Sequence, residues 1–226
     1  MNSLEIFLEI SQKKTFAVAA HWPGWARSGR DEVSAIQSLW ESAPRYAKAI
    51  SFFGLEFHSP QSTSALIILD RLEGNATTDF GAPDALFPDD WKTIGIKELE
   101  RSKLILSSCW KAFDQAISAA QGKELKKGPR GGGRDLPKII QHVVEAEEGY
   151  LRVLGYKPIK MSEASIEERK SHLREEAFIG LELAISSSIP KVGPKGGKRW
   201  PPKFYIRRAA WHALDHAWEI EDRILS

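Results

Sequence analysis

The chain has 226 residues, of which 42% are hydrophobic and 27% are charged, and its formal net charge is +2. This composition is too apolar for a disordered protein, and so small a net charge gives no sign of a nucleic-acid partner. No run of about 18 apolar residues is present, which excludes a transmembrane helix, and the acidic N-terminus does not have the pattern of a signal peptide. The single cysteine, Cys109, favours a reducing compartment. We therefore expect a soluble, cytoplasmic protein with no membrane partner.

Residues 1–80 have the pattern of a small domain of mixed α and β structure. Alternating apolar residues predict three strands, over residues 4–10, 15–20 and 65–69. A helical period of apolar residues runs from 31 to 50, with Asp31 as its N-cap and Pro44 as a position where the helix would kink or end. The Trp22-Pro23-Gly24-Trp25 segment is expected to break regular structure.

The stretch 81–95 is rich in Gly, Pro and Asp and lacks periodicity, so we predict a linker there. The remainder, residues 96–226, has helical patterns throughout. Four segments of similar length carry them: 97–120, 135–154, 165–187 and 203–225. Asp135 and Ser165 match N-cap patterns for the second and third of these segments. Four helices of matched length predict a four-helix bundle, and the fold class of the whole chain is therefore α+β.

Two of the predicted connections between these helices are rich in glycine and basic residues. They are residues 122–134 and 192–203, which together hold nine basic residues and one acidic residue, Glu124. Loops of this composition are usually solvated turns. The alternative is a cationic rim that attracts an anionic ligand.

A pair of histidines gives the sequence its clearest chemical signal. His212 and His216 are four residues apart on the last predicted helix, so they share one face about one turn apart. Two imidazoles in this position suit one metal ion, and a catalytic site needs a third protein ligand. His142 is the candidate, because it would lie at a similar depth in the bundle. The alternative is that all three are core residues.

Other polar residues are given less specific roles. Glu219 is one turn from His216 and could accept a hydrogen bond from a ligand imidazole, and Asp215 is the alternative for that role. Cys109 is expected to be a buried small hydrophobe. Three histidines are expected to be structural or solvated: His21, His58 and His172. The acidic pairs Asp89-Asp90 and Glu147-Glu148 are expected to be solvated.

At this point two segments together resemble a known family. His142-Val-Val-Glu-Ala-Glu-Glu-Gly-Tyr-Leu-Arg and Trp211-His212-Ala-Leu-Asp-His216-Ala-Trp-Glu-Ile-Glu are similar to the DinB-like superfamily of bacterial four-helix bundles. The resemblance covers about residues 96–226 and implies a divalent metal, zinc or nickel, held by His142, His212 and His216. It also implies an up-down-down-up order of helices, with a long crossover over residues 155–164.

The resemblance carries an expectation of function. Characterised relatives include thiol-dependent S-transferases, in which a metal lowers the pKa of a thiol. It implies a metal-dependent enzyme of S-transferase or hydrolase type that activates a thiol or water. The partner would be a small-molecule substrate, either anionic or a low-molecular-weight thiol.

The N-terminal part resembles a second family. The segment Thr15-Phe-Ala-Val-Ala-Ala-His-Trp-Pro23-Gly24-Trp25, with the helix that follows it, is similar to HicB-like domains. These are small α/β folds, and the resemblance implies fold more than function.

Two alternatives to an enzyme stay open. The first is a non-catalytic stress-response or binding module in which the metal is structural. The second is nucleic-acid binding through the N-terminal domain and the basic loops, which the small net charge makes less favourable. The chain has eight tryptophans, which would favour a homodimer if several were exposed.

Overall fold

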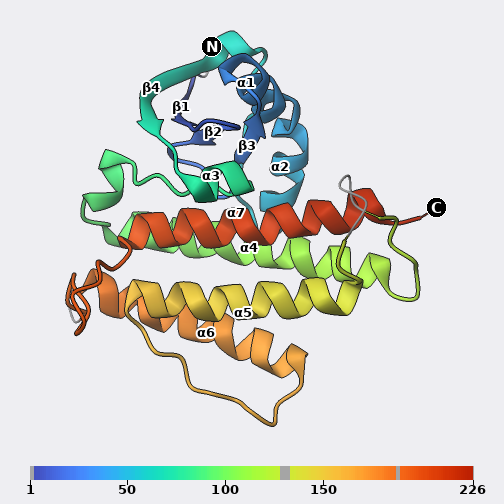
Figure 1. Cartoon of the computed structure of the whole chain (residues 1–226), viewed down its shortest axis with the longest axis vertical. Coiled ribbons are helices and arrows are strands. Elements are labelled where there is room, and N and C mark those ends of the chain that lie inside the picture. The colour runs from blue at the N-terminus through green and yellow to red at the C-terminus, as the bar shows by residue number, and fades with distance from the viewer. Residues whose placement is uncertain (1–2, 128–132, 187–188, 226) are drawn as a thin grey trace.

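The computed structural model describes residues 3–127, 133–186 and 189–225. Its N-terminal part contains a four-stranded sheet in the order β3-β2-β1-β4, in which β1 pairs antiparallel with β2 and parallel with β4. The strands are β1 (Leu4–Ile10), β2 (Thr15–Ala19), β3 (Ala26–Gly29) and β4 (Leu66–Glu73). Seven α-helices accompany the sheet in the described residues, so the predicted α+β class is confirmed (Figure 1).

The strand β3 was not predicted, because Pro23 and Gly24 indicated irregular structure. The expected break in regular structure is confirmed, because the two residues form a tight turn in which Gly24 has a φ of 93°, and the chain then folds back into β3. A side chain at Gly24 would meet Leu214 and Ala210 of the last helix at 3.1 and 3.2 Å. Glycine is therefore required here both for its φ and for the close approach of the turn to that helix.

The two faces of the sheet pack against different elements. Ile6 and Leu8 of β1 belong to the main core, together with α1 (Glu32–Glu41) and α2 (Ala43–Ile50). Phe7, between them, points to the opposite face and lies in a second cluster with Trp211. This alternation is the period of two that defines a strand buried on both faces.

The predicted helix over residues 31–50 is two helices that meet at Ser42. Pro44 lies in the first turn of α2, where its missing N–H group has no helical partner to lose. The Leu39 carbonyl at the break accepts a hydrogen bond of 3.2 Å from the buried Trp25 indole. The N–H and hydroxyl groups of Ser42 donate to the same carbonyl, so three donors hold the chain where the two helices meet.

The predicted linker, 81–95, is partly buried between the sheet and the last helix. It follows α3 (Ala76–Phe80). Phe87 stacks on Phe7 of β1 with 4.6 Å between ring centroids. Asp90 is 2% exposed and forms an ion pair with Arg207, although it was expected to be solvated. That expectation was wrong because no pattern around Asp90 indicates that Arg207 is buried beside it.

Four long helices form the C-terminal part, close to the predicted boundaries. They are α4 (Ile96–Ala120), α5 (Leu136–Leu154), α6 (Ile166–Ile185) and α7 (Pro202–Arg223). Asp135 caps α5, and Ser165 forms a capping box with Glu168 at the start of α6, as predicted. Among the described residues, no helix is both long enough and apolar enough to cross a membrane.

The connection between α5 and α6 runs back along the bundle, so these two helices point in the same direction (Figure 1). The loop after α4 and the loop before α7 consequently lie at opposite ends of the bundle, and the basic residues do not form one rim. The first loop contacts the end of α7, because Lys126 N–H donates to the Arg223 carbonyl. Arg130 of this loop lies outside the described residues.

Two further expectations concern buried groups of the bundle. Cys109 is fully buried, as predicted. Glu147 was expected to be solvated but is 4% exposed, and it accepts a 2.7 Å hydrogen bond from the Trp110 indole. Burial raises the pKa of Glu147. The prediction was wrong because Glu147 lies on the apolar side of α5. The neighbouring Glu145 and Glu148 made the whole segment look solvated in the sequence.

Candidate metal centre

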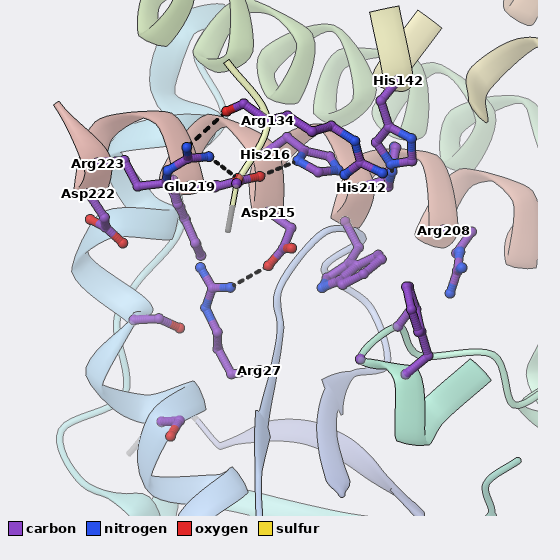
Figure 2. A pocket seen from close by; sticks show the side chains of 18 of the residues that line it. Arg27, Arg134, His142, Arg208, His212, Asp215, His216, Glu219, Asp222 and Arg223 are labelled. Carbon is purple, nitrogen blue, oxygen red and sulfur yellow. Dashed lines mark hydrogen bonds and ion pairs between the residues drawn. The ribbon is translucent and has the colours of Figure 1, made fainter. Parts of the chain in front are cut away.

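The structure brings the three predicted histidines together. His142 comes from α5 and His212 and His216 from α7, and one potential ligand nitrogen from each lies within 4.8 Å of the other two. His212 and His216 are buried and His142 is half-buried. Figure 2 shows the three rings converging from the two helices. The cluster is compatible with a metal site.

The separation of the histidines fits a single metal ion. Nε2 of His142 and Nε2 of His212 are 3.4 Å apart. Two nitrogens that bind one zinc ion tetrahedrally at about 2.0–2.1 Å are about 3.3–3.4 Å apart. The ring centroids of His212 and His216 are 4.6 Å apart, as expected for neighbours one helical turn apart on the same face.

The protonation of the histidines also suits metal binding. Burial, with the positive charges of His216 and Arg134, lowers the pKa of His142 to about 4. Burial also places the pKa of His212 well below its usual range, and the neighbouring histidines lower it further. Both rings are therefore neutral at pH 7, and only neutral imidazole offers a lone pair to a metal. Nδ1 of His212 is buried and has no hydrogen-bond partner among the residues that the structure describes.

These low pKa values give a pH prediction for the metal-free protein. Below about pH 6.5, His142 and His212 become protonated in the unfolded chain but stay neutral in the folded protein, because folding lowers their pKa values. The free energy of unfolding should therefore fall as the pH decreases from about 6.5 towards 4. Urea unfolding at several pH values measures this slope. A variant that lacks both histidines should have a shallower slope, and an identical slope would contradict the prediction.

Glu219 fixes the orientation of His216. Its carboxylate contacts Nδ1 of His216 at 2.7 Å and also accepts a hydrogen bond from Arg223. Although partial burial raises the pKa of Glu219, the hydrogen bonds and charges of His216 and Arg223 outweigh it and lower that pKa. An ionised carboxylate on Nδ1 leaves Nε2 of His216 as the atom that faces the cluster.

Removing this charge should weaken metal binding without removing a ligand. Glu219→Gln is expected to reduce zinc affinity by about tenfold, because a carboxylate on a ligand imidazole makes it a better donor. A competition titration with a chromogenic chelator measures the change. Glu221→Gln is the matched control, since Glu221 lies on the same helix as Glu219 but pairs with Arg45 of α2. Equal zinc affinities in the two variants would contradict this role.

Arg223 connects the site to the first basic loop, a contact that the sequence did not indicate. Besides Glu219, its guanidinium donates to the carbonyl oxygens of Lys126 and Arg134 at 2.9 and 2.8 Å. Figure 2 shows Arg223 between the Arg134 backbone and Glu219. The described residues at both ends of this loop are thus held beside the histidines.

Asp215, the alternative partner for a histidine, is paired elsewhere. Its carboxylate accepts a 3.1 Å hydrogen bond from Arg27 of β3, and Figure 2 shows it on the side of α7 that faces the sheet. The Arg27 guanidinium also stacks on Trp218 at 3.8 Å from the ring centroid. Asp215 therefore ties the sheet to α7, whereas Glu219 is the carboxylate that contacts a histidine of the cluster.

A pocket of about 1120 Å³ opens in front of the histidines. Both parts of the chain line it: Arg27 and Phe80 come from the N-terminal part, and Arg208 and the histidines from the bundle. A structural metal site is normally closed by protein, whereas a catalytic one keeps a position open to a substrate. This cluster lies at the wall of a pocket large enough for a small molecule.

No family model, curated protein or solved structure matches this chain. The remaining histidines lie outside it: His21 contacts Glu5 at the surface, His58 is exposed, and His172 is half-buried near Glu176.

Proposed function

We propose that this chain is a metal-dependent enzyme of the DinB-like type, in which His142, His212 and His216 hold a divalent metal, zinc or nickel. The observation that carries the proposal is the three-histidine cluster at the wall of an open pocket. Three neutral imidazoles leave one position of a tetrahedral ion for water or substrate. The N-terminal part is proposed to be a HicB-like domain that contributes Arg27 to the pocket.

The residues of the chain have separable roles in this proposal. Glu219 holds the ring of His216, and Arg223 keeps Glu219 ionised and in place. A bound metal would lower the pKa of a thiol or a water molecule, which makes it a nucleophile at neutral pH. The reaction is thus of S-transferase or hydrolase type, with a thiol or water as nucleophile.

Thiol binding to the cobalt-substituted protein tests this function. Cobalt(II) reports thiolate binding through a sulfur-to-metal charge-transfer band, and 2-mercaptoethanol serves as the probe. We expect the band in the wild type and its loss in a His212→Ala/His216→Ala variant. Absence of the band in cobalt-loaded wild type would contradict thiol activation and leave water as the nucleophile.

A structural metal is the second candidate, and one observation favours it. Within the described part of the pocket, the carboxylates nearest the histidines are already engaged: Glu219 by His216 and Arg223, and Asp215 by Arg27. Neither is a free general base. This alternative predicts that metal removal lowers the unfolding temperature while no thiol or water reaches the ion.

A further inference from the structure

Two arginines beside the histidines have no acidic partner among the described residues. Arg208 lies on α7 one turn before His212 and donates to the Pro83 carbonyl oxygen, while its Nε is buried and has no hydrogen-bond partner within the described part of the chain. Arg134 is exposed, and Figure 2 shows its side chain extending towards the histidines.

The other basic side chains of the pocket are different, because each has an acidic partner. The pairs are Arg27 with Asp215, Arg45 with Asp222, Lys138 with Asp135, and Arg223 with Glu219. Asp84, which follows Pro83 in the chain, accepts a hydrogen bond from Asn75. Arg134 and Arg208 are thus the basic residues of the described lining whose charge no ion pair balances.

The charge of the pocket as a whole is also unbalanced. Six basic and four acidic side chains line its described part, and Asp135, the partner of Lys138, lies beside it, which leaves an excess of one positive charge. A divalent metal bound by three neutral imidazoles would add two more positive charges to the pocket. Unbalanced charges in a partly desolvated site are costly, and an anionic ligand removes much of that cost.

Arg208 is held in place before any ligand arrives. Its guanidinium lies 5.1 Å from the centroid of the Trp211 ring and 5.7 Å from that of Tyr150, and it hydrogen-bonds to the Tyr150 side chain. Stacking on aromatic rings restrains the guanidinium, so little side-chain entropy is lost when an anion binds. The planar fork of an arginine matches two oxygens of a carboxylate or a phosphate.

We propose that this pocket takes a small molecule with an oxyanion group, a carboxylate or a phosphate, held by Arg208 and Arg134 next to the histidine cluster. The inference deepens the proposed function, because the oxyanion would place the reacting part of the substrate beside the metal. It does not depend on the metal for binding. The exposed Phe80 side chain on the pocket wall offers an apolar contact to the rest of the molecule.

Calorimetric titration with inorganic phosphate and with succinate, at low ionic strength, tests the inference. The wild type is titrated both metal-free and zinc-loaded, and the two probes distinguish a phosphate from a carboxylate ligand. Arg208→Gln should weaken binding at least tenfold in both forms, and Arg134→Gln severalfold. Lys138→Gln is the matched control, because it also removes a positive charge from the pocket, but one that is already paired with Asp135. The affinity of this variant for each probe should stay within about twofold of the wild-type affinity.

The outcomes separate this inference from the metal proposal. Arginine-dependent binding to the metal-free protein supports the oxyanion site even if no metal binds. Failure of both probes to bind either form overturns the inference. So does binding that survives Arg208→Gln and Arg134→Gln, since the metal alone would then hold the anion. Because Arg134 is exposed, its variant should fold normally if Arg208→Gln does not.

Discussion

Asp90→Asn is expected to lower the free energy of unfolding by about 3–5 kcal/mol, because it breaks a buried ion pair. The substitution leaves the guanidinium of Arg207 buried without its counter-charge, although Nη2 of Arg207 is 2.8 Å from Asp90 in the native protein. Asp90 also accepts a hydrogen bond of 2.8 Å from the Phe87 backbone N–H. Both contacts lie where the 81–95 segment joins the sheet to α7. Urea unfolding monitored by tryptophan fluorescence measures the loss.

The adjacent residue provides the control for this prediction. Asp89 pairs with Lys92 and Lys203 near the surface, so Asp89→Asn should cost less than about 1 kcal/mol. Losses of equal size in the two variants would show that the buried pair has no special role in stability.

His212→Ala/His216→Ala is expected to reduce zinc affinity by at least a hundredfold. The variant removes two of the three nitrogens that converge within 4.8 Å, and loss of an outer hydrogen-bonding partner alone costs about 10–100-fold. Competition with a chelator measures the affinity. The matched control is His172→Ala, which removes a half-buried histidine outside the cluster. Unchanged zinc affinity in the double variant would rule out these residues as the ligands.

Much of the fold could be predicted from the sequence, because its signals are local. Alternation over residues 4–10 and the caps at Asp135 and Ser165 depend on neighbouring residues, and the structure agrees with them. The break at Ser42 was foreseen only as a kink or end at Pro44. The strand β3 was missed because the tight turn at Gly24 depends on its contact with α7.

The three histidines of the site could be predicted from their positions along the predicted helices. His212 and His216 share one face because of the helical period. The position of His142 along its own helix predicted that it would lie at a similar depth in the bundle. The partners of these residues come from distant parts of the chain. The pairing of Arg27 with Asp215 joins residues 188 positions apart, and no local pattern indicates it. The burial of Asp90 could not be predicted for the same reason, because its partner Arg207 is distant in the sequence. The burial of Glu147 was missed because other acidic residues surround it in the sequence.

The metal content of untagged protein shows whether His142, His212 and His216 hold a metal ion. Elemental analysis of the purified wild type should find close to one divalent ion, zinc or nickel, per chain. The His212→Ala/His216→Ala variant, purified in parallel, should contain almost none. A wild type that contains no metal and takes up neither added zinc nor added nickel would contradict the account, and would make the three histidines residues of the core.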